Sequence, residues 1–262
     1  MPVPPVRPSF PPVDVLCFDI GNTHAHWGVV RGRDVIRSGV LETATLDETS
    51  LGRVLADGPS AGLAFASVVP AATARALPVL AASGRRLHHL RHDTVVGLGF
   101  DDPTPAEVGQ DRLADCVGAQ LLVGPPAVVV GMGTATTVDI LTSKGYAGGI
   151  IAPGLGVMTR YLHERTALLP ALDPAKLLGG PAIGRSTVDA MRAGCAIGFS
   201  GMIGALLDAV TAEMERRGDG RPQVLFTGGA SDFLPDSWRA RVRHEPGLTL
   251  IGLAESFRRT AP

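Results

Sequence analysis

The chain of 262 residues contains the same short pattern twice: an apolar run, a turn of glycine and small polar residues, and a second extended run. In the first copy, residues 13–20 precede Gly21-Asn22-Thr23. The second copy lies 112 residues further on, where Ala127–Met132 precedes Gly133-Thr134-Ala135-Thr136-Thr137 and residues 138–141 follow. Apolar runs bounded by glycine predict strands, and two copies of the unit predict a duplicated architecture.

Helical patterns alternate with these strands, which predicts an α/β fold. We expect helices over residues 46–55, 71–82, Gln110–Leu122 and 186–217, and a further strand over 224–226. Gly124-Pro125-Pro126 lies between a helix and a strand, so we expect an N-terminal domain over 13–125 and a C-terminal domain over 126–262. Prolines interrupt every apolar run in residues 1–12, which are expected to form a disordered leader rather than a signal peptide.

Charge and composition exclude several classes of function. With 24 Lys plus Arg against 25 Asp plus Glu, the chain has no basic footprint for nucleic acid or for an anionic membrane. The most apolar stretch, residues 117–132, is broken by Pro125-Pro126 and is too short to span a bilayer. Neither Lys144 nor Lys176 lies in a P-loop. The three cysteines have no metal-ligand spacing, which is typical of a protein of the reducing cytoplasm.

The two glycine turns are candidates for binding phosphate. Asp19 ends the first strand, and the amide and hydroxyl groups of Asn22 and Thr23 follow it. Such donors suit phosphate oxygens, and a carboxylate suits Mg²⁺. The turn that begins at Gly133 repeats the donors, so two turns facing one another would clamp a polyphosphate. For either turn alone, a hydrogen-bonded hairpin remains an equal alternative.

Gly109-Gln110-Asp111-Arg112 opens a predicted helix. An acidic residue there is often only a capping feature. Beside a phosphate clamp, however, Asp111 is suited to accept a hydroxyl proton, and Arg112 to bind a substrate carboxylate.

The long helix predicted over 186–217 carries glycines at spacings of four and three, at Gly194, Gly198 and Gly201. Ser186 and Thr187 are its candidate N-caps. Glycine weakens a helix, so we expect a close packing partner on this face, and a strand or helix of the same chain is favoured over a dimer interface.

Two groups of histidines have spacing compatible with metal binding: His24 with His26, and His88-His89 with His92. Neither group has a cysteine or a clear additional ligand nearby. We therefore expect solvated or core histidines rather than metal sites.

Seven segments, in the same order, make the chain resemble the type III pantothenate kinase family after the leader. They are Asp19-Ile20-Gly21-Asn22-Thr23, Ser67-Val68-Val69-Pro70, Gly109-Gln110-Asp111-Arg112, Gly133-Thr134-Ala135-Thr136-Thr137, Tyr146-x-Gly148-Gly149-x-Ile151-x-Pro153-Gly154, Gly184-Arg185-Ser186-Thr187 and Thr227-Gly228-Gly229. The resemblance implies two ribonuclease H-like domains of the actin and sugar-kinase superfamily, and a homodimer. It also implies transfer of the γ-phosphoryl group of ATP to pantothenate, the first step of coenzyme A biosynthesis.

The same resemblance implies roles for individual residues. Asp111 is the expected general base. The expected ATP-binding residues are Asp19, Ile20, Gly21, Asn22, Thr23, His24, Ala25, His26, Gly133, Thr134 and Thr136. The expected pantothenate-binding residues are Phe100, Gly109, Gln110, Asp111, Arg112 and, near the partner subunit, Thr187. The expected cofactors are Mg²⁺, with Asp19 as a ligand, and a monovalent cation, K⁺ or NH₄⁺.

Two positions depart from the family's pattern. Where the family usually has an aspartate associated with the monovalent cation, this chain has Gly131, and where it commonly has a tyrosine that touches pantothenate, the nearest aromatic residue is Phe100. Asp139 is either a substitute for the missing acid or a solvated strand residue. The departures leave open a non-catalytic nucleotide-binding regulatory or accessory protein, or a kinase for another hydroxyl substrate. Asp111, together with Asp19 and Arg112, favours an enzyme.

Overall fold

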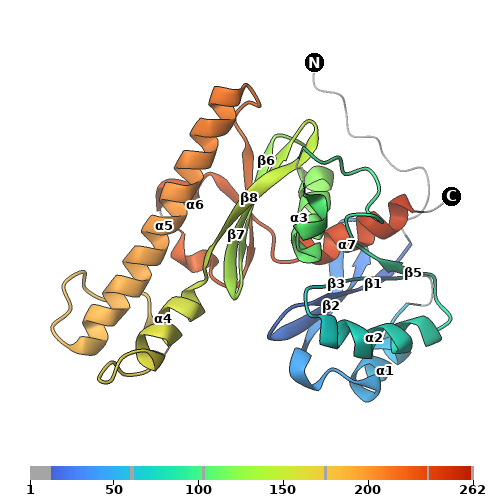
Figure 1. Cartoon of the computed structure of the whole chain (residues 1–262), viewed down its shortest axis with the longest axis horizontal. Coiled ribbons are helices and arrows are strands. Elements are labelled where there is room, and N and C mark those ends of the chain that lie inside the picture. The colour runs from blue at the N-terminus through green and yellow to red at the C-terminus, as the bar shows by residue number, and fades with distance from the viewer. Residues whose placement is uncertain (1–12, 60–61, 102–103, 174–175, 235, 261–262) are drawn as a thin grey trace.

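The computed structural model describes residues 13–59, 62–101, 104–173, 176–234 and 236–260, so the expected leader lies outside the described residues. Within these ranges the chain forms two five-stranded sheets, with helices between them and on their outer faces (Figure 1).

The two sheets share one topology. The first has the order β3-β2-β1-β4-β5 and the second the order β10-β9-β6-β7-β8. In each sheet the first three strands along the chain are antiparallel neighbours, and the last two continue the sheet in parallel. The strands are β1 Val15–Ile20, β2 His24–Arg31, β3 Asp34–Glu42, β4 Leu63–Ser67, β5 Leu87–His89, β6 Ala127–Met132, β7 Ala135–Thr142, β8 Gly145–Pro153, β9 Gln223–Gly228 and β10 Val242–His244. The duplication predicted from the sequence is confirmed.

Strand register shows which positions of the two halves correspond. Asp19 on β1 is paired with His26 on β2 and with Ala66 on β4. Gly131 on β6 has the same two neighbours in its own sheet, Thr137 on β7 and Thr227 on β9. Gly131 is therefore the counterpart of Asp19 in the second half of the chain.

The helices form three layers around the sheets. Helices α1 and α2 pack on the outer face of the first sheet, α3 and α7 lie between the two sheets, and α5 covers the outer face of the second; Figure 1 shows these layers. The α-helices are α1 Glu48–Asp57, α2 Pro70–Ala82, α3 Gln110–Leu122, α4 Leu155–Glu164, α5 Thr187–Arg217, α6 Asp236–Arg239 and α7 Leu248–Arg259.

Helices α3 and α7, which lie between the sheets, cross at two glycines, Gly118 of α3 and Gly252 of α7. A side chain on Gly252 of α7 would collide with the backbone oxygen of Ala114 on α3, and one on Gly118 would lie 2.8 Å from the backbone oxygen of Leu248. The C-terminal helix thereby holds α3 against β1 and β4 of the first sheet.

The four predicted helices lie within two residues of their expected bounds. The shorter helices α4 and α6 and the C-terminal helix α7 were not predicted, nor were β3, β4, β5, β8 and β10. Several of these are edge strands or short elements, in which hydrophobic periodicity is weak.

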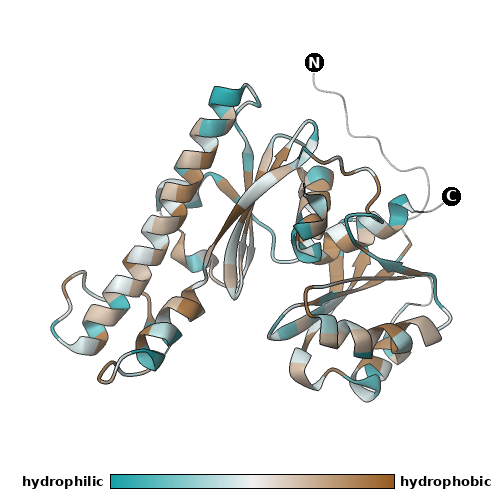
Figure 2. Ribbon diagram, in the orientation of Figure 1, coloured by the Kyte–Doolittle hydropathy of each residue, from teal (hydrophilic) through white to brown (hydrophobic). Residues whose placement is uncertain are grey.

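Helix α5 begins as predicted and ends at a glycine. The Ser186 hydroxyl accepts a hydrogen bond from the Asp189 N–H at 3.1 Å, and Gly218 terminates the helix with φ +80°. By length and composition alone α5 could cross a membrane, although a core helix of a soluble protein meets the same criterion. Figure 2 shows apolar and polar residues alternating along its outer side.

The prediction of a close partner from the same chain on α5 is wrong within the described residues. A Cβ placed on Gly194, Gly198 or Gly201 would have no neighbouring atom within 4 Å, and Ile197 between them is exposed. The small residues face outward because the core side of α5 is formed by other positions, among them Phe199 and Ile203.

Candidate active site

Both predicted phosphate-binding turns are hairpin turns at equivalent ends of the two sheets. The Gly21 N–H donates to the His24 backbone oxygen at 3.0 Å, and the Gly133 N–H donates to the Ala135 backbone oxygen at 3.1 Å. Asn22, Thr23 and Thr134 are exposed. The hairpin alternative therefore describes their backbone, and the exposed side chains still leave donors for a ligand. The clamp of two facing turns stays a prediction.

A group of carboxyl side chains lies between the sheets. Asp19 ends β1, Asp111 and Asp115 lie one turn apart on α3, and Asp139 is on β7. Burial and mutual repulsion act on this group: Asp111 raises the pKa values of Asp19, Asp115 and Asp139. Four acids close enough to influence one another in a buried region are typical of a functional site.

Asp19 is the next-to-last residue of β1, just before the first turn, and Asp111 is the second residue of α3. Burial and the Asp111 charge raise the pKa of Asp19 to about 7, and burial raises the pKa of Asp111. The Arg112 N–H donates to Asp111 Oδ1 at 2.8 Å, which fixes one carboxylate oxygen at the start of α3. Two half-buried carboxyls, of which Asp111 disfavours the charge on Asp19, fit a hard cation such as Mg²⁺, because its charge would stabilise both anions.

Arg112 is held by Asp139. Its Nε and Nη2 both lie 2.7 Å from Asp139 Oδ1, and the Asp139 side chain is completely buried. The pKa of Asp139 is raised to about 6 by burial, against the opposing effect of Arg112. The alternative that Asp139 is a solvated strand residue is therefore wrong. Two of the three guanidinium nitrogens of Arg112, Nε and Nη2, are therefore already paired with Asp139 before any substrate binds.

Asp115 is a site residue that the sequence analysis missed. Its Oδ1 accepts a hydrogen bond from the Thr249 hydroxyl of α7 at 2.7 Å, and burial raises its pKa well above the usual range. Its Oδ2 lies 3.7 Å from the position that a Cβ on Gly131 would occupy. The spacing of four residues from Asp111 places both acids on one helix face and was the available signal. Nothing in the sequence pointed to Thr249.

The structure places the other predicted ATP-binding residues in different settings. Ile20 and Ala25 are core residues, so only their backbone can face a ligand. His24 and His26 are exposed on one face of β2, with ring centroids 6.2 Å apart. Thr136 is buried, and its hydroxyl donates to the Pro153 backbone oxygen at 3.3 Å.

The predicted pantothenate-binding residues are only partly brought together. Gly109 precedes α3 as its N-cap, and Gln110 is the first residue of that helix. Phe100 forms a β-bridge with Tyr146, whose ring lies 5.8 Å from the Arg112 guanidinium carbon. Thr187 starts α5, at the side of the molecule away from α3 (Figure 1), so this chain does not bring it to Asp111.

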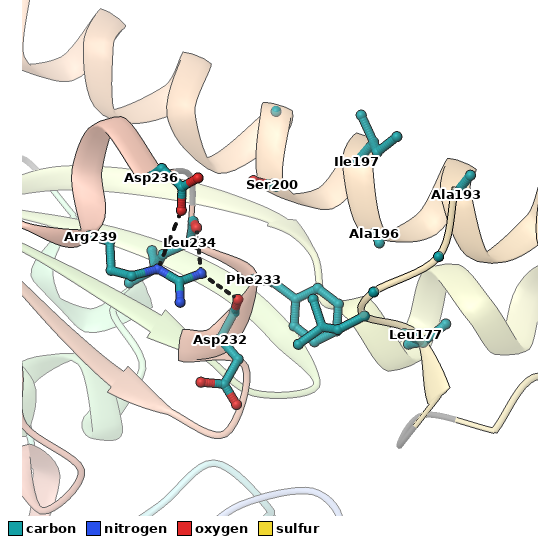
Figure 3. A pocket seen from close by; sticks show the side chains of 14 residues that line it. Leu177, Ala193, Ala196, Ile197, Ser200, Asp232, Phe233, Leu234, Asp236 and Arg239 are labelled. Atoms are coloured by element: carbon teal, nitrogen blue, oxygen red, sulfur yellow. Dashed lines mark hydrogen bonds and ion pairs between the residues drawn. The ribbon is translucent and has the colours of Figure 1, made fainter. Parts of the chain in front are cut away.

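Among the residues that the structure describes, no group of three or more His, Cys, Asp or Glu side chains is arranged to hold a metal ion. A cavity of about 450 Å³ lies between α5, residues 177–180 and α6 (Figure 3). Arg239 at its end donates to the Asp232 backbone oxygen at 2.8 Å, and Ala193 and Ile197 form an apolar wall. None of the four carboxyls lines this cavity, so we do not place the reaction there.

The two halves of the chain are equivalent five-stranded sheets, and in the first half a carboxylate lies near the end of the first strand with a glycine turn after it. Solved structures agree on the fold. A 2-dehydro-3-deoxygalactonokinase from Sinorhizobium meliloti, a provisional assignment, has TM-score 0.57 at 17% identity, covering 95% of this chain and 97% of its own. A Baf family transcriptional activator from Campylobacter jejuni, also a provisional assignment, has TM-score 0.60 at 19% identity, covering 93% and 97%.

The chain belongs to the type III pantothenate kinase family, whose sequence profile matches residues 15–209. A type III pantothenate kinase of Methylacidiphilum infernorum is 34% identical over 247 residues, which cover 91% of this chain and 86% of that protein. One of Akkermansia muciniphila is 42% identical over 168 residues, which cover 63% of this chain and 66% of that protein.

Proposed function

We propose that this protein transfers the γ-phosphoryl group of ATP to pantothenate in the bacterial cytoplasm, forming 4'-phosphopantothenate in the first step of coenzyme A biosynthesis. Membership of the type III pantothenate kinase family supports the reaction and its substrates. The observation that carries the proposal is the half-buried pair of Asp19 and Asp111, placed near the end of β1 and at the start of α3.

Asp111 is the proposed general base. Its carboxylate accepts the proton of the substrate hydroxyl as that oxygen attacks the γ-phosphorus, and the bond from phosphorus to the β-γ bridging oxygen breaks to release ADP. Burial raises the pKa of Asp111, which makes the carboxylate a better proton acceptor. Asp19 would hold Mg²⁺, which supplies positive charge to the phosphate oxygens. The exposed Asn22, Thr23 and Thr134 would donate hydrogen bonds to the same phosphates.

Arg112 is the proposed group for the pantothenate carboxylate. Asp139 fixes one side of the guanidinium through Nε and Nη2, so the arginine is oriented before substrate binds. Because the guanidinium is already held in place, Arg112 loses little side-chain conformational entropy when the carboxylate binds.

We also propose a homodimer in which the partner's α5 packs on the glycine face of this helix. The exposed Gly194, Gly198 and Gly201 allow two helices to approach closely, and Ile197 supplies apolar area. Thr187 lies away from Asp111 in its own chain, so the dimer is the route by which it would reach a substrate.

The monovalent cation is the weakest part of the family's pattern in this chain. Gly131 offers no side-chain oxygen, and Asp139 Oδ1 is engaged by Arg112. We therefore propose activity that is largely indifferent to K⁺ against Na⁺.

The proposal is tested with the purified protein, ATP, Mg²⁺ and pantothenate, with phosphopantothenate measured by mass spectrometry. K⁺, NH₄⁺ and Na⁺ are supplied in turn, and other hydroxy acids replace pantothenate as acceptor controls. Phosphopantothenate formed with all three cations supports the proposal. ATP binding without transfer to any acceptor would instead support the non-catalytic alternative, and transfer to another acceptor would support a kinase of different specificity.

A further inference from the structure

His89, Gln110 and Ser67 form a half-buried polar bridge beside the candidate catalytic carboxylates. The Ser67 N–H donates to Gln110 Oε1 at 2.8 Å, and Nε2 of His89 lies 3.0 Å from the same oxygen. The bridge joins β4, β5 and the first residue of α3. We refer to these three residues as the His89–Gln110–Ser67 bridge.

The hydrogen-bond directions in this bridge are fixed by its chemistry. A backbone N–H can only donate, so the Gln110 atom facing Ser67 is the amide oxygen rather than the nitrogen. That oxygen can only accept, so the His89 Nε2 beside it carries a proton. The carbonyl end of Gln110 is therefore occupied by two donors from the protein, and only its NH₂ end remains for a substrate.

The bridge replaces a missing strand contact. Strand β5 ends at His89, which is paired with Phe65, so the Ser67 N–H two residues further along β4 lies beyond the strand pairing. Gln110 Oε1 takes this donor. The His89 ring is fixed as well, because it stacks on the buried Phe65 ring with centroids 4.0 Å apart, and the Thr94 hydroxyl donates to the His89 backbone oxygen at 2.7 Å.

The bridge also sets where Asp111 lies relative to Asp19. Ser67 is the register partner of Ile20, and the next amide, that of Val68, donates to the Ile20 backbone oxygen at 3.1 Å. The start of α3 is thus tied to the strand end that carries Asp19. Helix α3 has no side-chain hydrogen bond from its N-cap Gly109, so the Gln110 side chain provides an anchor that capping does not.

We propose that His89 is a positioning residue for the phosphoryl transfer, acting through Gln110 to hold Asp111 at its working distance from Asp19. The inference rests on the proposed function and adds to it a residue that touches neither substrate. Misplacing a catalytic group by a fraction of an ångström lowers the rate without altering how ATP binds.

The test compares His89→Phe, which keeps the ring stacked on Phe65 but removes the donor, with Gln110→Met, which removes the acceptor. Each is expected to lower kcat about tenfold with the KM for ATP within about twofold of wild type. The double variant is expected to lose no more than Gln110→Met alone, because that substitution already removes the contact that His89→Phe breaks. His89→Gln, which restores an amide donor, is expected to recover kcat to within about threefold of wild type.

His88→Phe is the matched control. His88 is the adjacent residue on β5, but its Nε2 lies 2.9 Å from the Ser256 hydroxyl on α7, away from the start of α3. This variant is expected to lower Tm and leave kcat unchanged. If His89→Phe behaves in the same way, or if the losses in the double variant add, the positioning role is wrong. Should His89→Phe fail to fold, His89→Leu, which also removes the donor and leaves Gln110 in place, decides the question by the same criteria.

A measurement independent of activity separates this inference from the proposed function. Hydrogen exchange at the Ser67 amide is expected to speed up in both His89→Phe and Gln110→Met, because its acceptor is loosened or lost. Unchanged exchange would overturn the bridge even in an active kinase. A wild-type protein that does not phosphorylate pantothenate, with faster exchange in the variants, would overturn the proposed function and leave only the anchoring of α3.

Discussion

The four acids between the sheets have distinct roles that follow from their surroundings. Asp19 precedes the first turn and Asp111 lies at the start of α3, Asp139 holds Arg112, and Asp115 is bound to Thr249. Only the first pair is free of a side-chain partner of opposite charge or a hydroxyl donor among the contacts of the described residues. We therefore expect substitutions at the four positions to separate catalysis from stability.

Replacement of Asp111 is the most direct test of catalysis. Asp111→Asn keeps the size of the side chain and an oxygen that can accept the Arg112 N–H, but it cannot take a proton. We expect kcat to fall by about 10²- to 10⁴-fold, with ATP affinity measured by calorimetry unchanged. Turnover within threefold of wild type would remove Asp111 from the role of base.

Replacement of Asp115 is expected to affect stability in a pH-dependent way. Burial raises the pKa of Asp115 well above that of the unfolded chain. As pH rises, the Asp115 carboxyl therefore ionises at a lower pH in the unfolded chain than in the folded protein. The folded state loses stability from about pH 4 upward, until the pH passes the pKa of Asp115 in the folded protein. Asp115→Asn removes this loss and keeps an acceptor for Thr249. We expect Tm to match wild type near pH 4 and to exceed it at pH 7 by about 2–4 °C per kcal/mol regained.

Thermal unfolding followed by circular dichroism from pH 4 to pH 8 measures this effect. Asp236→Asn, at a fully exposed side chain, is the control and is expected to leave Tm unchanged throughout. A Tm difference between Asp115→Asn and wild type that does not vary with pH would contradict the explanation.

At the scale of secondary structure, the crossing of α3 and α7 controls where α3 lies. The two helices approach so closely that a side chain on Gly252 would collide with the Ala114 backbone oxygen. Backbone cannot move aside as a flexible side chain can, so the helices themselves must separate if this glycine is replaced.

We expect Gly252→Ala to lower the free energy of unfolding by about 1–3 kcal/mol, as overpacked cores do. Gly52→Ala in α1 is the control, because a Cβ there would have no neighbour within 4 Å. Alanine in an open helical position is expected to stabilise by about 0.5–1 kcal/mol. Denaturation in urea measures both, and a stabilising Gly252→Ala would show that the crossing tolerates wider spacing.

At the scale of the whole molecule, the exposed face of α5 is the surface on which the proposed dimer depends. This helix is long and apolar, yet only 28% of its most apolar window is buried within the chain. Burial against a second copy removes that surface from water without requiring a membrane.

Ile197→Glu places a charge in the centre of this face and is expected to convert a dimer into a monomer at micromolar concentration. Sedimentation velocity measures the change, and Arg33→Glu, on the exposed turn between β2 and β3, is the matched control. We expect the monomer to lose pantothenate turnover, because Thr187 would no longer reach the partner's site. A monomeric wild type, or a monomeric variant with full activity, would contradict the proposed dimer.

The sequence by itself determined the local features of this protein. Periodicity and turn chemistry located the four predicted helices and the strands before both glycine turns, because these patterns depend on neighbours along the chain. The repeat of the turns predicted the duplicated sheets. The position of the domain boundary near residue 125 and the roles of the site residues stay predictions.

Only the tertiary structure decided which distant residues meet. Asp139 pairs with Arg112, Thr249 with Asp115, and His89 with Gln110, although 27, 134 and 21 residues separate them. These contacts depend on strand register and on the crossing of α3 and α7, and neither leaves a periodic signal in the sequence. The glycines of α5 show the same limit: their spacing indicated close packing, but only the fold showed that this face points away from the rest of the chain, because the opposite face forms the core.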